Sequence, residues 1–478
     1  MTESLHGPWH EECGVYGVYA PDEDVSTLTY LGLYALQHRG QESAGIAVTD
    51  GAWMDVSRGM GLVNEVFRHQ VPHMDNQRIA IGHVRYSTTG SSLRINTQPL
   101  IVNYAGGKIS LAHNGNLTNA PEIRHELEQN GAMFQTSVDT EVILNLIARS
   151  RKETIEEKLA DSLNKVKGAY CITLMTETKL IGARDPQGFR PLCIGRLDDG
   201  WVLSSETCGL DVIGAEFVRD VEPGEMVVID GSGPDNIKSI RFTPKQKLAS
   251  CIFEYIYFAR SDSIIDGQSV HDARFMMGRI LAREHCPKAD IVISVPDSGT
   301  TAATGYAYES GIPFVEGLMK NRYIGRTFIQ PTQKKRDTAV QLKLNAIRSA
   351  VNGKSVIMVD DSIVRGTTSG KIVKMLRNAG AREVHMCVSS PPIGFPCYYG
   401  IDTQVRKELI AATKSVEEIR EYIQADSLHF LSIEGLKKAM TAVDPEQMCY
   451  ACFNSDYPIE KGELPEGAGK YVFEQRKK

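Results

Sequence analysis

The first half of the chain carries short runs in which apolar and polar residues alternate, separated by turn-forming residues. Alternation with a period of two predicts strands with one buried and one polar face, as in antiparallel sheets. Apolar residues with helical spacing at about residues 28–36, 139–149 and 155–165 predict helices that cover those sheets. The expected strands have the sequences C-G-V-Y-G-V-Y, A-G-I-A-V, R-I-A-I-G-H-V-R-Y, I-S-L-A-H-N-G-N, Y-C-I-T-L-M, L-I-G-A-R-D, W-V-L-S-S-E and E-M-V-V-I-D.

The pattern changes after a polar, turn-rich stretch at residues 230–245, which is the best candidate for a linker between domains. Strand-like runs at residues 291–295, 356–359 and 384–388 are separated by helix-length segments, as is typical of a parallel α/β sheet. After Tyr398 the pattern becomes helical and charged. The sequence therefore predicts an α/β protein of two domains, the first with antiparallel sheets and the second with a parallel sheet and a helical extension.

Composition narrows the classes of protein to consider. The 478 residues are enough for two domains with ample cores, and the net charge of −6 is too mild for a general nucleic-acid surface. No apolar run approaches the roughly 18 residues that span a bilayer, and the N-terminal sequence lacks the features of a signal peptide. We therefore expect a cytoplasmic protein that binds neither nucleic acid nor membrane. There, ten cysteines suggest metal or nucleophilic chemistry rather than disulfides.

The most informative segment is Val356–Gly370, V-I-M-V-D-D-S-I-V-R-G-T-T-S-G. A short buried strand ends in Asp360 and Asp361, and the turn that follows opens a helix-patterned segment from about Lys371 to Asn378. Backbone N–H groups and hydroxyls at a helix N-terminus bind anions, while adjacent carboxylates suit sugar hydroxyls or hydrated Mg²⁺. The segment therefore predicts a site for a phosphorylated sugar together with a metal ion.

A second loop supports this interpretation, because Pro296-Asp297-Ser298-Gly299 also follows a predicted strand and precedes a predicted helix. In an open parallel sheet both loops leave the carboxyl ends of strands and face one cleft. Two such loops suit a ligand with phosphates at both ends, whereas a plain strand–turn–helix with surface acids explains only the first. Residues 320–336 between them are basic and form either a lid over a polyanion or a solvated surface loop.

Val356–Gly370 closely resembles the 5-phosphoribosyl-1-pyrophosphate (PRPP) loop of type I phosphoribosyltransferases, and residues 296–299 look like their pyrophosphate loop. These enzymes displace pyrophosphate from C1 with a nitrogen nucleophile. No base-recognition part is evident in this chain, so the nitrogen must come from elsewhere. The resemblance implies PRPP contacts at Asp297, Ser298, Gly299, Asp360, Asp361, Arg365, Gly366, Thr367 and Thr368, of which Ser298, Asp360 and Asp361 would face Mg²⁺.

Cys13 opens the first predicted strand, after a polar leader. An N-terminal cysteine can act as its own base, because its α-amine has a pKa of about 7.7–8.0 and can shuttle protons for the thiol. Removal of residues 1–12 would create that arrangement. Taken alone, Cys13 is more simply a small buried hydrophobe, and Asn114-Gly115 is more simply a type I′ hairpin turn.

The segments that follow Cys13 favour a catalytic role for it over a packing role. L-Q-H-R-G-Q-E-S-A-G-I-A, G-H-V-R-Y-S-T-T-G, H-N-G-N-L-T-N and S-V-D-T-E follow in order, and with Cys13 they resemble the N-terminal-nucleophile (class II) glutamine amidotransferases. The resemblance implies an αββα sandwich in which Cys13 is the nucleophile. Arg85 would bind the carboxylate of glutamine and Asp139 its α-ammonium. Asn114 and the Gly115 N–H would form the oxyanion hole, as turn and donor pair at once.

Both resemblances on one chain indicate the family of glutamine PRPP amidotransferases, and they cover nearly all of it. The family passes ammonia from glutamine to C1 of PRPP, which gives 5-phosphoribosylamine, glutamate and pyrophosphate at the first committed step of purine synthesis. The resemblance also implies a homotetramer and inhibition by purine nucleotides. The alternative is a PRPP- and nucleotide-binding regulatory protein with a vestigial glutaminase domain, which the intact glutaminase residues disfavour.

Cys449 and Cys452 form a C-x-x-C pair that by itself is compatible with zinc, redox chemistry or chance. Cys251 and Cys397 lie among aromatic and apolar residues that would shield a sulfur cluster. The four positions match the iron–sulfur subgroup of this family, which implies a structural [4Fe–4S] cluster, while zinc and ordinary thiols stay open. The remaining cysteines are expected to be packing residues: Cys171, Cys193, Cys208, Cys286 and Cys387.

These resemblances divide the chain into four expected parts. A propeptide at residues 1–12 precedes a glutaminase domain at residues 13–240. A phosphoribosyltransferase domain at residues 246–420 follows, and a helical extension at residues 421–478 carries cluster ligands and ends in a mobile tail. Glutamine and PRPP are thus the expected substrates, and Mg²⁺ and a [4Fe–4S] cluster are the expected cofactors.

Overall fold

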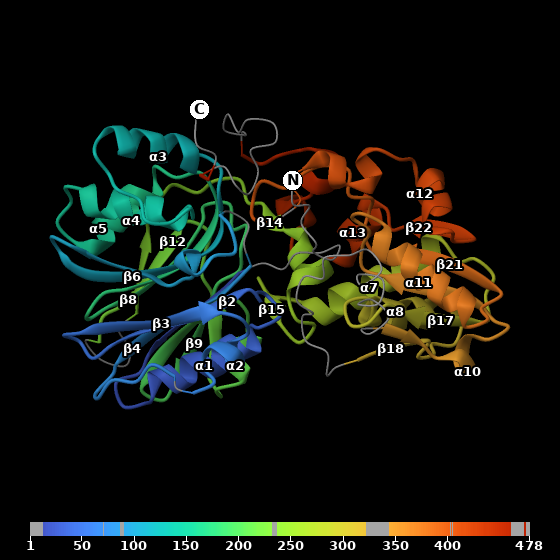
Figure 1. The fold of residues 1–478 in the computed structure, drawn as a ribbon, viewed down its shortest axis with the longest axis horizontal. Helices are drawn as coiled ribbons and strands as arrows, with labels where there is room; N and C mark the ends of the chain where they lie inside the picture. Colours follow the sequence, from blue (N-terminus) through green and yellow to red (C-terminus); the bar gives the residue numbers. More distant parts are fainter. Residues whose placement is uncertain are drawn as a thin grey trace.

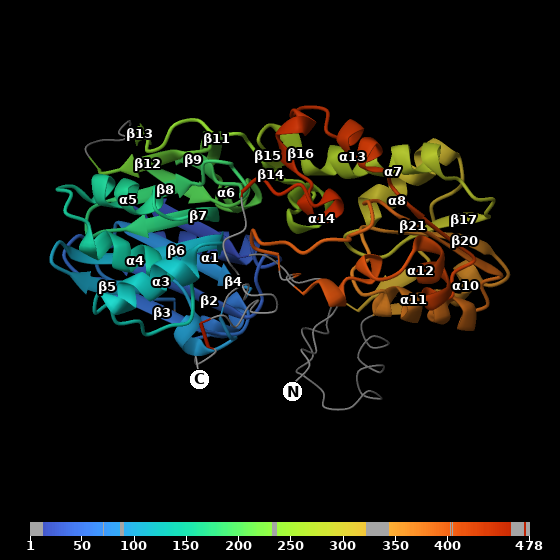
Figure 2. The ribbon, with the colours of Figure 1, turned by 90° about the horizontal axis from the view of Figure 1, so that it is seen from above.

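The computed structural model describes residues 13–69, 71–86, 90–231, 237–321, 344–401, 403, 405–459 and 473–474 (Figure 1). The expected propeptide lies outside these ranges, and so does most of the basic segment that we expected to be a lid or a surface loop. Among the described residues, no helix combines the length and apolar character needed to cross a membrane. Two bodies lie side by side, one built on antiparallel sheets and the other on a parallel sheet (Figure 2).

The first body is a sandwich of two antiparallel sheets, which confirms the predicted fold of this half. Side chains from the facing sides of both sheets, such as Val15, Ala112 and Leu203, form one buried cluster between them. The seven-stranded sheet has the order β11 (Glu216–Asp220), β9 (Cys193–Leu197), β10 (Gly200–Ser204), β1 (Gly14–Tyr19), β4 (Ile79–Arg85), β2 (Ser43–Thr49) and β3 (Met54–Met60). The six-stranded sheet has the order β13 (Ile237–Arg241), β12 (Glu225–Ile229), β8 (Leu180–Arg184), β7 (Gly168–Met175), β6 (Gly107–Leu117) and β5 (Leu100–Tyr104).

Helices cover the outer faces of this sandwich. Leu33 of α1 packs with Tyr16 on the seven-stranded sheet, and Ile143 of α4 packs with Leu111 on the six-stranded sheet. Strands β4 and β7 are therefore buried on both faces, so the polar face that we expected for them is absent, because helices cover the outer side of each sheet. The helices of this body are α1 (Val25–Ala35), α2 (Val63–Val66), α3 (Ala120–Gln129), α4 (Thr140–Arg149), α5 (Ile155–Leu163) and α6 (Cys208–Asp211).

The second body contains a four-stranded parallel sheet, as predicted. Its side chains alternate between two clusters, with Val292 and Ile357 in one and Ile293 and Met358 in the other. The strands have the order β17 (Ile291–Ser294), β20 (Ser355–Asp360), β21 (Glu383–Val388) and β22 (Ser427–Phe430). The first cluster includes α7 (Val270–Glu284) and α8 (Thr300–Ser310), and the second includes α11 (Thr367–Asn378) and α12 (Val416–Ile423).

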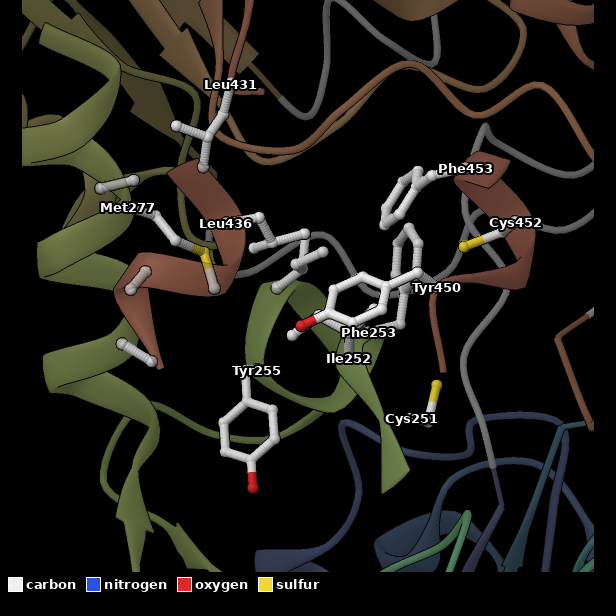
Figure 3. Close-up of a cluster of buried hydrophobic side chains, with 14 of the residues drawn as sticks. Cys251, Ile252, Phe253, Tyr255, Met277, Leu431, Leu436, Tyr450, Cys452 and Phe453 are labelled. Atoms are coloured by element: carbon white, nitrogen blue, oxygen red, sulfur yellow. The ribbon is translucent and has the colours of Figure 1, made fainter. Parts of the chain in front are cut away.

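The end of the chain packs onto the start of the second body. Strand β23 (Met448–Cys449) pairs in parallel with β14 (Ser250–Cys251), although nearly two hundred positions separate them in the sequence. Phe453 of α14 (Ala451–Asn454) stacks on Phe253, with ring centroids 5.6 Å apart, in the apolar cluster of Figure 3. The remaining elements are α13 (Ile433–Ala439), α10 (Arg348–Val351), β15 (Ile264–Ile265), β16 (Gln268–Ser269), β18 (Leu318–Lys320), β19 (Leu344–Ala346), a π-helical turn at Glu254–Phe258, and 3₁₀ turns at Arg94–Asn96, Arg406–Glu408, Ile410–Ala412 and Pro445–Gln447.

Some elements differ from the sequence expectation. Strand β22 lies in the segment that we expected to be helical, beyond the boundary expected at residue 420, and it completes the parallel sheet. Strand β13 lies inside the expected linker at residues 230–245 and pairs with β12. The strands that we did not predict include β3, β11 and β13, whose side chains are largely exposed and therefore lack an apolar alternation.

Helices α7 and α8 approach so closely that only glycine fits at two of their contacts. A Cβ on Gly278 would lie 1.8 Å from the Ala302 carbonyl oxygen, and a Cβ on Gly305 would lie 2.0 Å from the Phe275 carbonyl oxygen. These helices cover the strand β17, from which the pyrophosphate-type loop leaves. The close approach therefore sets the position of that loop.

We predict that Gly278→Ala destabilises the second body. Overpacking costs typically about 1–3 kcal/mol, more than the roughly 1 kcal/mol that alanine gains over glycine inside a helix. The midpoint of urea unfolding should therefore fall. Gly394→Ala is the matched control, because its Cβ would meet only the Ala411 carbonyl oxygen at 3.9 Å. Equal midpoints for both variants would contradict the close-packing argument.

Candidate active site

Cys13 lies immediately before β1, and its side chain is buried. Its thiol donates a hydrogen bond to the carbonyl oxygen of Tyr86 at 3.2 Å. The Nε of Arg39 donates to the carbonyl oxygen of Cys13 itself at 3.0 Å. The structure thus holds both the sulfur and the backbone of the predicted nucleophile.

Arg85 ends strand β4 and is 2% exposed. Burial lowers the pKa of Arg85, and the carboxylate of Glu42, 3.9 Å away, opposes that shift. The negative charges of Cys13 and Asp139 act on the pKa of Arg85 in the same direction as Glu42. The structure therefore brings the predicted nucleophile and both predicted glutamine contacts within electrostatic range of one another.

Asp139 precedes helix α4 and is also buried. Burial by itself would raise the pKa of this carboxyl, but His113, whose Nδ1 lies 3.5 Å from Oδ1, lowers it. The backbone N–H of Leu117 donates to Oδ2 at 2.9 Å and lowers it further, so that the net shift is downward. Asp139 therefore stays ionised, as a carboxylate that binds an ammonium group must.

Asn114 and Gly115 lie inside strand β6, so the interpretation of this pair as a hairpin turn was wrong. The turn occurs instead between β5 and β6, where Tyr104 pairs with Gly107. Gly115 has a φ of +145°, and a Cβ there would lie 2.0 Å from the Ala169 carbonyl oxygen, so a side chain is excluded. The buried Nδ2 of Asn114 has no hydrogen-bond partner among the described residues. Such a buried donor suits an acceptor that arrives with a ligand.

In the second body, Asp360 ends β20 and Asp361 follows it, and both are buried. Burial raises the pKa of Asp360, and the charge of Asp361 raises it further. Burial also raises the pKa of Asp361, although Ser298 donates from Oγ to its Oδ1 at 2.5 Å and Ser362 donates to its Oδ2. The two loops therefore meet, as predicted, through the hydrogen bond from Ser298 to Asp361, beside the buried carboxyl of Asp360.

The remaining PRPP candidates lie on the same edge of the sheet. Asp297 forms an ion pair with Lys320, and a Cβ on Gly299 would lie 2.7 Å from the Val359 carbonyl oxygen, so this loop passes close to β20. Gly366 has a φ of +72° where the turn enters α11. The structure places Arg365, Gly366, Thr367 and Thr368 at the N-terminus of α11, with Arg365 paired to Glu408.

Metal sites are not preformed in the described part of the chain. No group of three or more histidine, cysteine, aspartate or glutamate side chains there is arranged to hold a single metal ion. The donor set at the PRPP loop, two adjacent carboxylates and the Ser298 hydroxyl, still suits a hard cation that keeps several waters or binds together with a phosphate.

The four predicted cluster cysteines converge on one place. Cys251 and Cys449 are direct partners across the β14–β23 pair. Burial raises the pKa of Cys452, and the charges of Cys449, Cys397 and Cys251 raise it further, so these three sulfurs lie within electrostatic range of that of Cys452. In Figure 3, Cys251 and Cys452 reach the same region from β14 and α14. All ten cysteines are described, and none forms a disulfide.

A buried ionic network joins the two bodies behind Cys13. Arg39 donates from Nη1 to Glu206 at 2.6 Å, and its Nη1 and Nη2 donate to the two carboxylate oxygens of Glu254 at 2.9 and 2.8 Å. Arg190 lies 3.3 Å from Glu254 and donates to the Tyr399 carbonyl oxygen at 2.6 Å. We did not predict these roles. Arg39 stands in the quoted motif L-Q-H-R-G-Q-E, but Glu206 and Glu254 carry no local signal, because only folding brings them to it.

Comparison with known proteins agrees with this two-part organisation. A family profile described as a glutamine amidotransferase domain matches residues 83–211, and one described as a phosphoribosyl transferase domain matches residues 267–392. Each profile falls in the body whose fold and predicted residues correspond to it.

Relatives of the whole chain are also known. The amidophosphoribosyltransferase of Bacillus subtilis is 51% identical over 455 residues, which cover 94% of this chain and 95% of the relative. The amidophosphoribosyltransferase of Archaeoglobus fulgidus is 51% identical over 455 residues, which cover 94% and 98%. The solved structure of glutamine PRPP amidotransferase from B. subtilis, complexed with ADP and GMP, is 50% identical, has a TM-score of 0.88, and covers 95% of this chain and 100% of that chain. The chain therefore belongs to the amidophosphoribosyltransferase family, which serves purine biosynthesis.

Proposed function

We propose that the chain carries out the family reaction with the two sites described above. The Cys13 site releases ammonia from glutamine, and the site around Asp360 and Asp361 receives it at C1 of PRPP. The products are 5-phosphoribosylamine, glutamate and pyrophosphate. The observation that carries this assignment is the buried Nδ2 of Asn114 on β6, which has no hydrogen-bond partner among the described residues. A donor in that state is suited to an oxyanion. Strand β6 contacts β1, and Cys13 immediately precedes β1.

The glutaminase half needs a free α-amine on Cys13, and therefore removal of residues 1–12. The amine accepts the thiol proton, and the sulfur attacks the side-chain amide carbon of glutamine. Asn114 Nδ2 and the Gly115 N–H stabilise the oxyanion, and ammonia leaves with the proton that the amine held. Arg85 and Asp139 bind the carboxylate and α-ammonium ends of glutamine. Water then releases glutamate from the thioester.

The phosphoribosyl half works mainly by holding charge. The first turn of α11 and Arg365 bind the 5-phosphate, while Asp297, Ser298 and Gly299 contact the pyrophosphate. Asp360 and Asp361 bind the ribose hydroxyls and face the positive charge that develops at C1 as pyrophosphate departs. Mg²⁺, held by these carboxylates and Ser298, would neutralise the leaving group.

The four converging cysteines fit a [4Fe–4S] cluster better than zinc. Thiolates around four iron atoms stand farther apart than thiolates around one ion, and the described residues hold no set arranged for one ion. Burial raises the pKa of Cys449 to about 12, so without a metal this sulfur would be a neutral thiol. The cluster would be structural, since Cys251 and Cys449 join the start of the second body to the chain end.

Regulation and assembly are proposed by analogy with relatives. One solved relative was crystallised with ADP and GMP, and another is described as the allosteric regulatory enzyme of purine biosynthesis. We extend purine nucleotide inhibition to this chain on that basis, while the homotetramer stays what the sequence resemblance implies. The cytoplasmic location and the division of the chain into four parts stay predictions from the sequence.

Cys13→Ala should separate the two reactions. Activity with glutamine and PRPP should fall at least about 10³-fold, because the nucleophile is lost, while activity with ammonium chloride and PRPP persists. Phosphoribosylamine and glutamate formation measure the two arms, and Cys286→Ala, at an exposed thiol, is the control. Mass spectrometry of the active protein should show Cys13 at its N-terminus. Full glutamine-dependent activity in Cys13→Ala would overturn the assignment.

Asp361→Asn should reduce kcat/KM for PRPP by about 10²-fold with either nitrogen donor, because the carboxylate facing the sugar and cation is lost. Initial rates at varied PRPP and Mg²⁺ measure this effect. Glu383→Gln is the control, since this residue begins β21 at the opposite end of the sheet. An unchanged kcat/KM in Asp361→Asn would remove the PRPP site from this loop.

Cys452→Ser should abolish iron and sulfide binding after anaerobic purification and lower the thermal midpoint, because a cluster bound in the folded state stabilises it. Iron analysis, visible absorbance and thermal unfolding measure the three effects. Cys286→Ser should leave all of them unchanged. Stoichiometric zinc, or full iron content in Cys452→Ser, would contradict the cluster.

A further inference from the structure

Phe473 and Glu474, near the end of the sequence, contact the glutaminase body at the predicted glutamine site. The carboxylate oxygen Oε1 of Glu474 accepts hydrogen bonds from the backbone N–H of Ser91 at 2.6 Å and from the hydroxyl of Ser137 at 2.8 Å. Partial burial opposes ionisation of Glu474, but these hydrogen bonds and the nearby Arg85 lower its pKa. The group that occupies this position is therefore a carboxylate.

The two donors, the Ser91 N–H and the Ser137 hydroxyl, belong to a cradle of groups that hydrogen bonds hold in place. Asn96 is fully buried, and its Nδ2 donates to the Ser91 carbonyl oxygen and the Ser137 hydroxyl, both at 2.9 Å. Its Oδ1 accepts the Ser137 N–H at 3.0 Å. Arg85 Nη1 donates to the Ser91 carbonyl oxygen at 3.3 Å, so the cradle is continuous with the predicted glutamine contact. The buried hydroxyl oxygen of Ser91 has no hydrogen-bond partner among the described residues and is a further group for a ligand.

Phe473, the residue before Glu474, has contacts of its own with the glutaminase body. It packs at the edge of the apolar cluster beneath α3 and α4. The guanidinium of Arg124 lies 4.9 Å from the Phe473 ring centroid and 4.2 Å from that of Phe134. Arg124 is itself held by hydrogen bonds to Glu128 at 3.0 Å and to the Thr136 carbonyl oxygen at 2.9 Å. Phe473 and Glu474 thus each have their own specific partners at the edge of the predicted glutamine site.

We propose that Glu474 is an internal competitor of glutamine, seated in a carboxylate cradle made by the Ser91 N–H and the Ser137 hydroxyl beside Arg85. The inference rests on the proposed glutamine site. Glutamine presents an α-carboxylate to this site, and the side chain of Glu474 presents the same group from the chain itself. A tethered competitor has an effective concentration that does not change with dilution. The apparent KM for glutamine therefore equals the intrinsic KM divided by the fraction of molecules in which Glu474 is undocked.

The test compares Glu474→Gln and Phe473→Ala with the unaltered enzyme. Both variants should lower the KM for glutamine by about 3- to 10-fold, because the docked fraction falls, and should leave kcat within about 2-fold. Activity with ammonium chloride should not change. Glu466→Gln, which alters another glutamate of the same terminal segment, is the matched control and should keep the original KM.

A peptide with the sequence of residues 469–478 provides an independent readout. It should inhibit the Glu474→Gln enzyme competitively with glutamine, and the same peptide with glutamine in place of its glutamate should not. An unchanged KM in both variants together with an inactive peptide would overturn the proposal. A raised KM in Glu474→Gln would overturn it as well, since Glu474 would then complete the site rather than compete for it.

Arg85→Lys distinguishes this failure from failure of the glutamine site. Loss of the bidentate guanidinium should raise the KM for glutamine, about 10-fold or more, if Arg85 binds the substrate carboxylate. If Arg85→Lys raises the KM while Glu474→Gln has no effect, only the competitor is excluded. If Arg85→Lys leaves the KM unchanged, the glutamine assignment itself falls and the competitor falls with it.

Discussion

The arrangement of the two bodies depends on one buried guanidinium. Arg39 and its partners Glu206 and Glu254 are each 1% exposed, and removing Arg39 would leave two buried carboxylates whose charge, among the described residues, only His38 and Arg190 then offset. Such a charge costs several kcal/mol, whereas the paired set is satisfied by short, partly bidentate hydrogen bonds. Because Arg39 also holds the Cys13 carbonyl oxygen, the position of the nucleophile and the position of the second body are set by the same side chain.

The network continues from the glutaminase site toward the phosphoribosyl site. Glu206 accepts the backbone N–H of Arg260 at 2.9 Å, in the loop that follows the π-helical turn of the second body. Arg274 donates to the carbonyl oxygen of Ala259 in the same loop at 2.8 Å, and its charge partly opposes the upward shift that burial gives the pKa of Asp361. This loop is therefore anchored by a carboxylate of one body and by a guanidinium that acts on the other site.

The sequence predicted what local signals specify. Strand β20 is rich in β-branched residues and ends at the two acids Asp360 and Asp361, so the sequence predicted both the strand and its chemistry. The glutaminase residues stand in motifs that follow one another in order along the chain. Strand β13, with the sequence I-K-S-I-R, was not readable, because it is an edge strand with exposed side chains that depends on β12 for its hydrogen bonds. The partners Glu206 and Glu254 were missed for a related reason. They become informative only when folding places them beside Arg39.

The acidic pair at the PRPP loop determines how the stability of the second site depends on ionisation. A carboxyl whose pKa is raised in the folded state binds its proton more tightly there than in the unfolded chain. Ionisation of Asp360 and Asp361 above their ordinary value of 3.8 therefore works against the fold, increasingly as the pH rises through the raised pKa values. Asp139 has the opposite shift, and its ionisation stabilises the fold. The first site thus holds an ionised carboxylate whose hydrogen bonds are satisfied, whereas in the second site burial and the neighbouring charge disfavour the ionisation of Asp360.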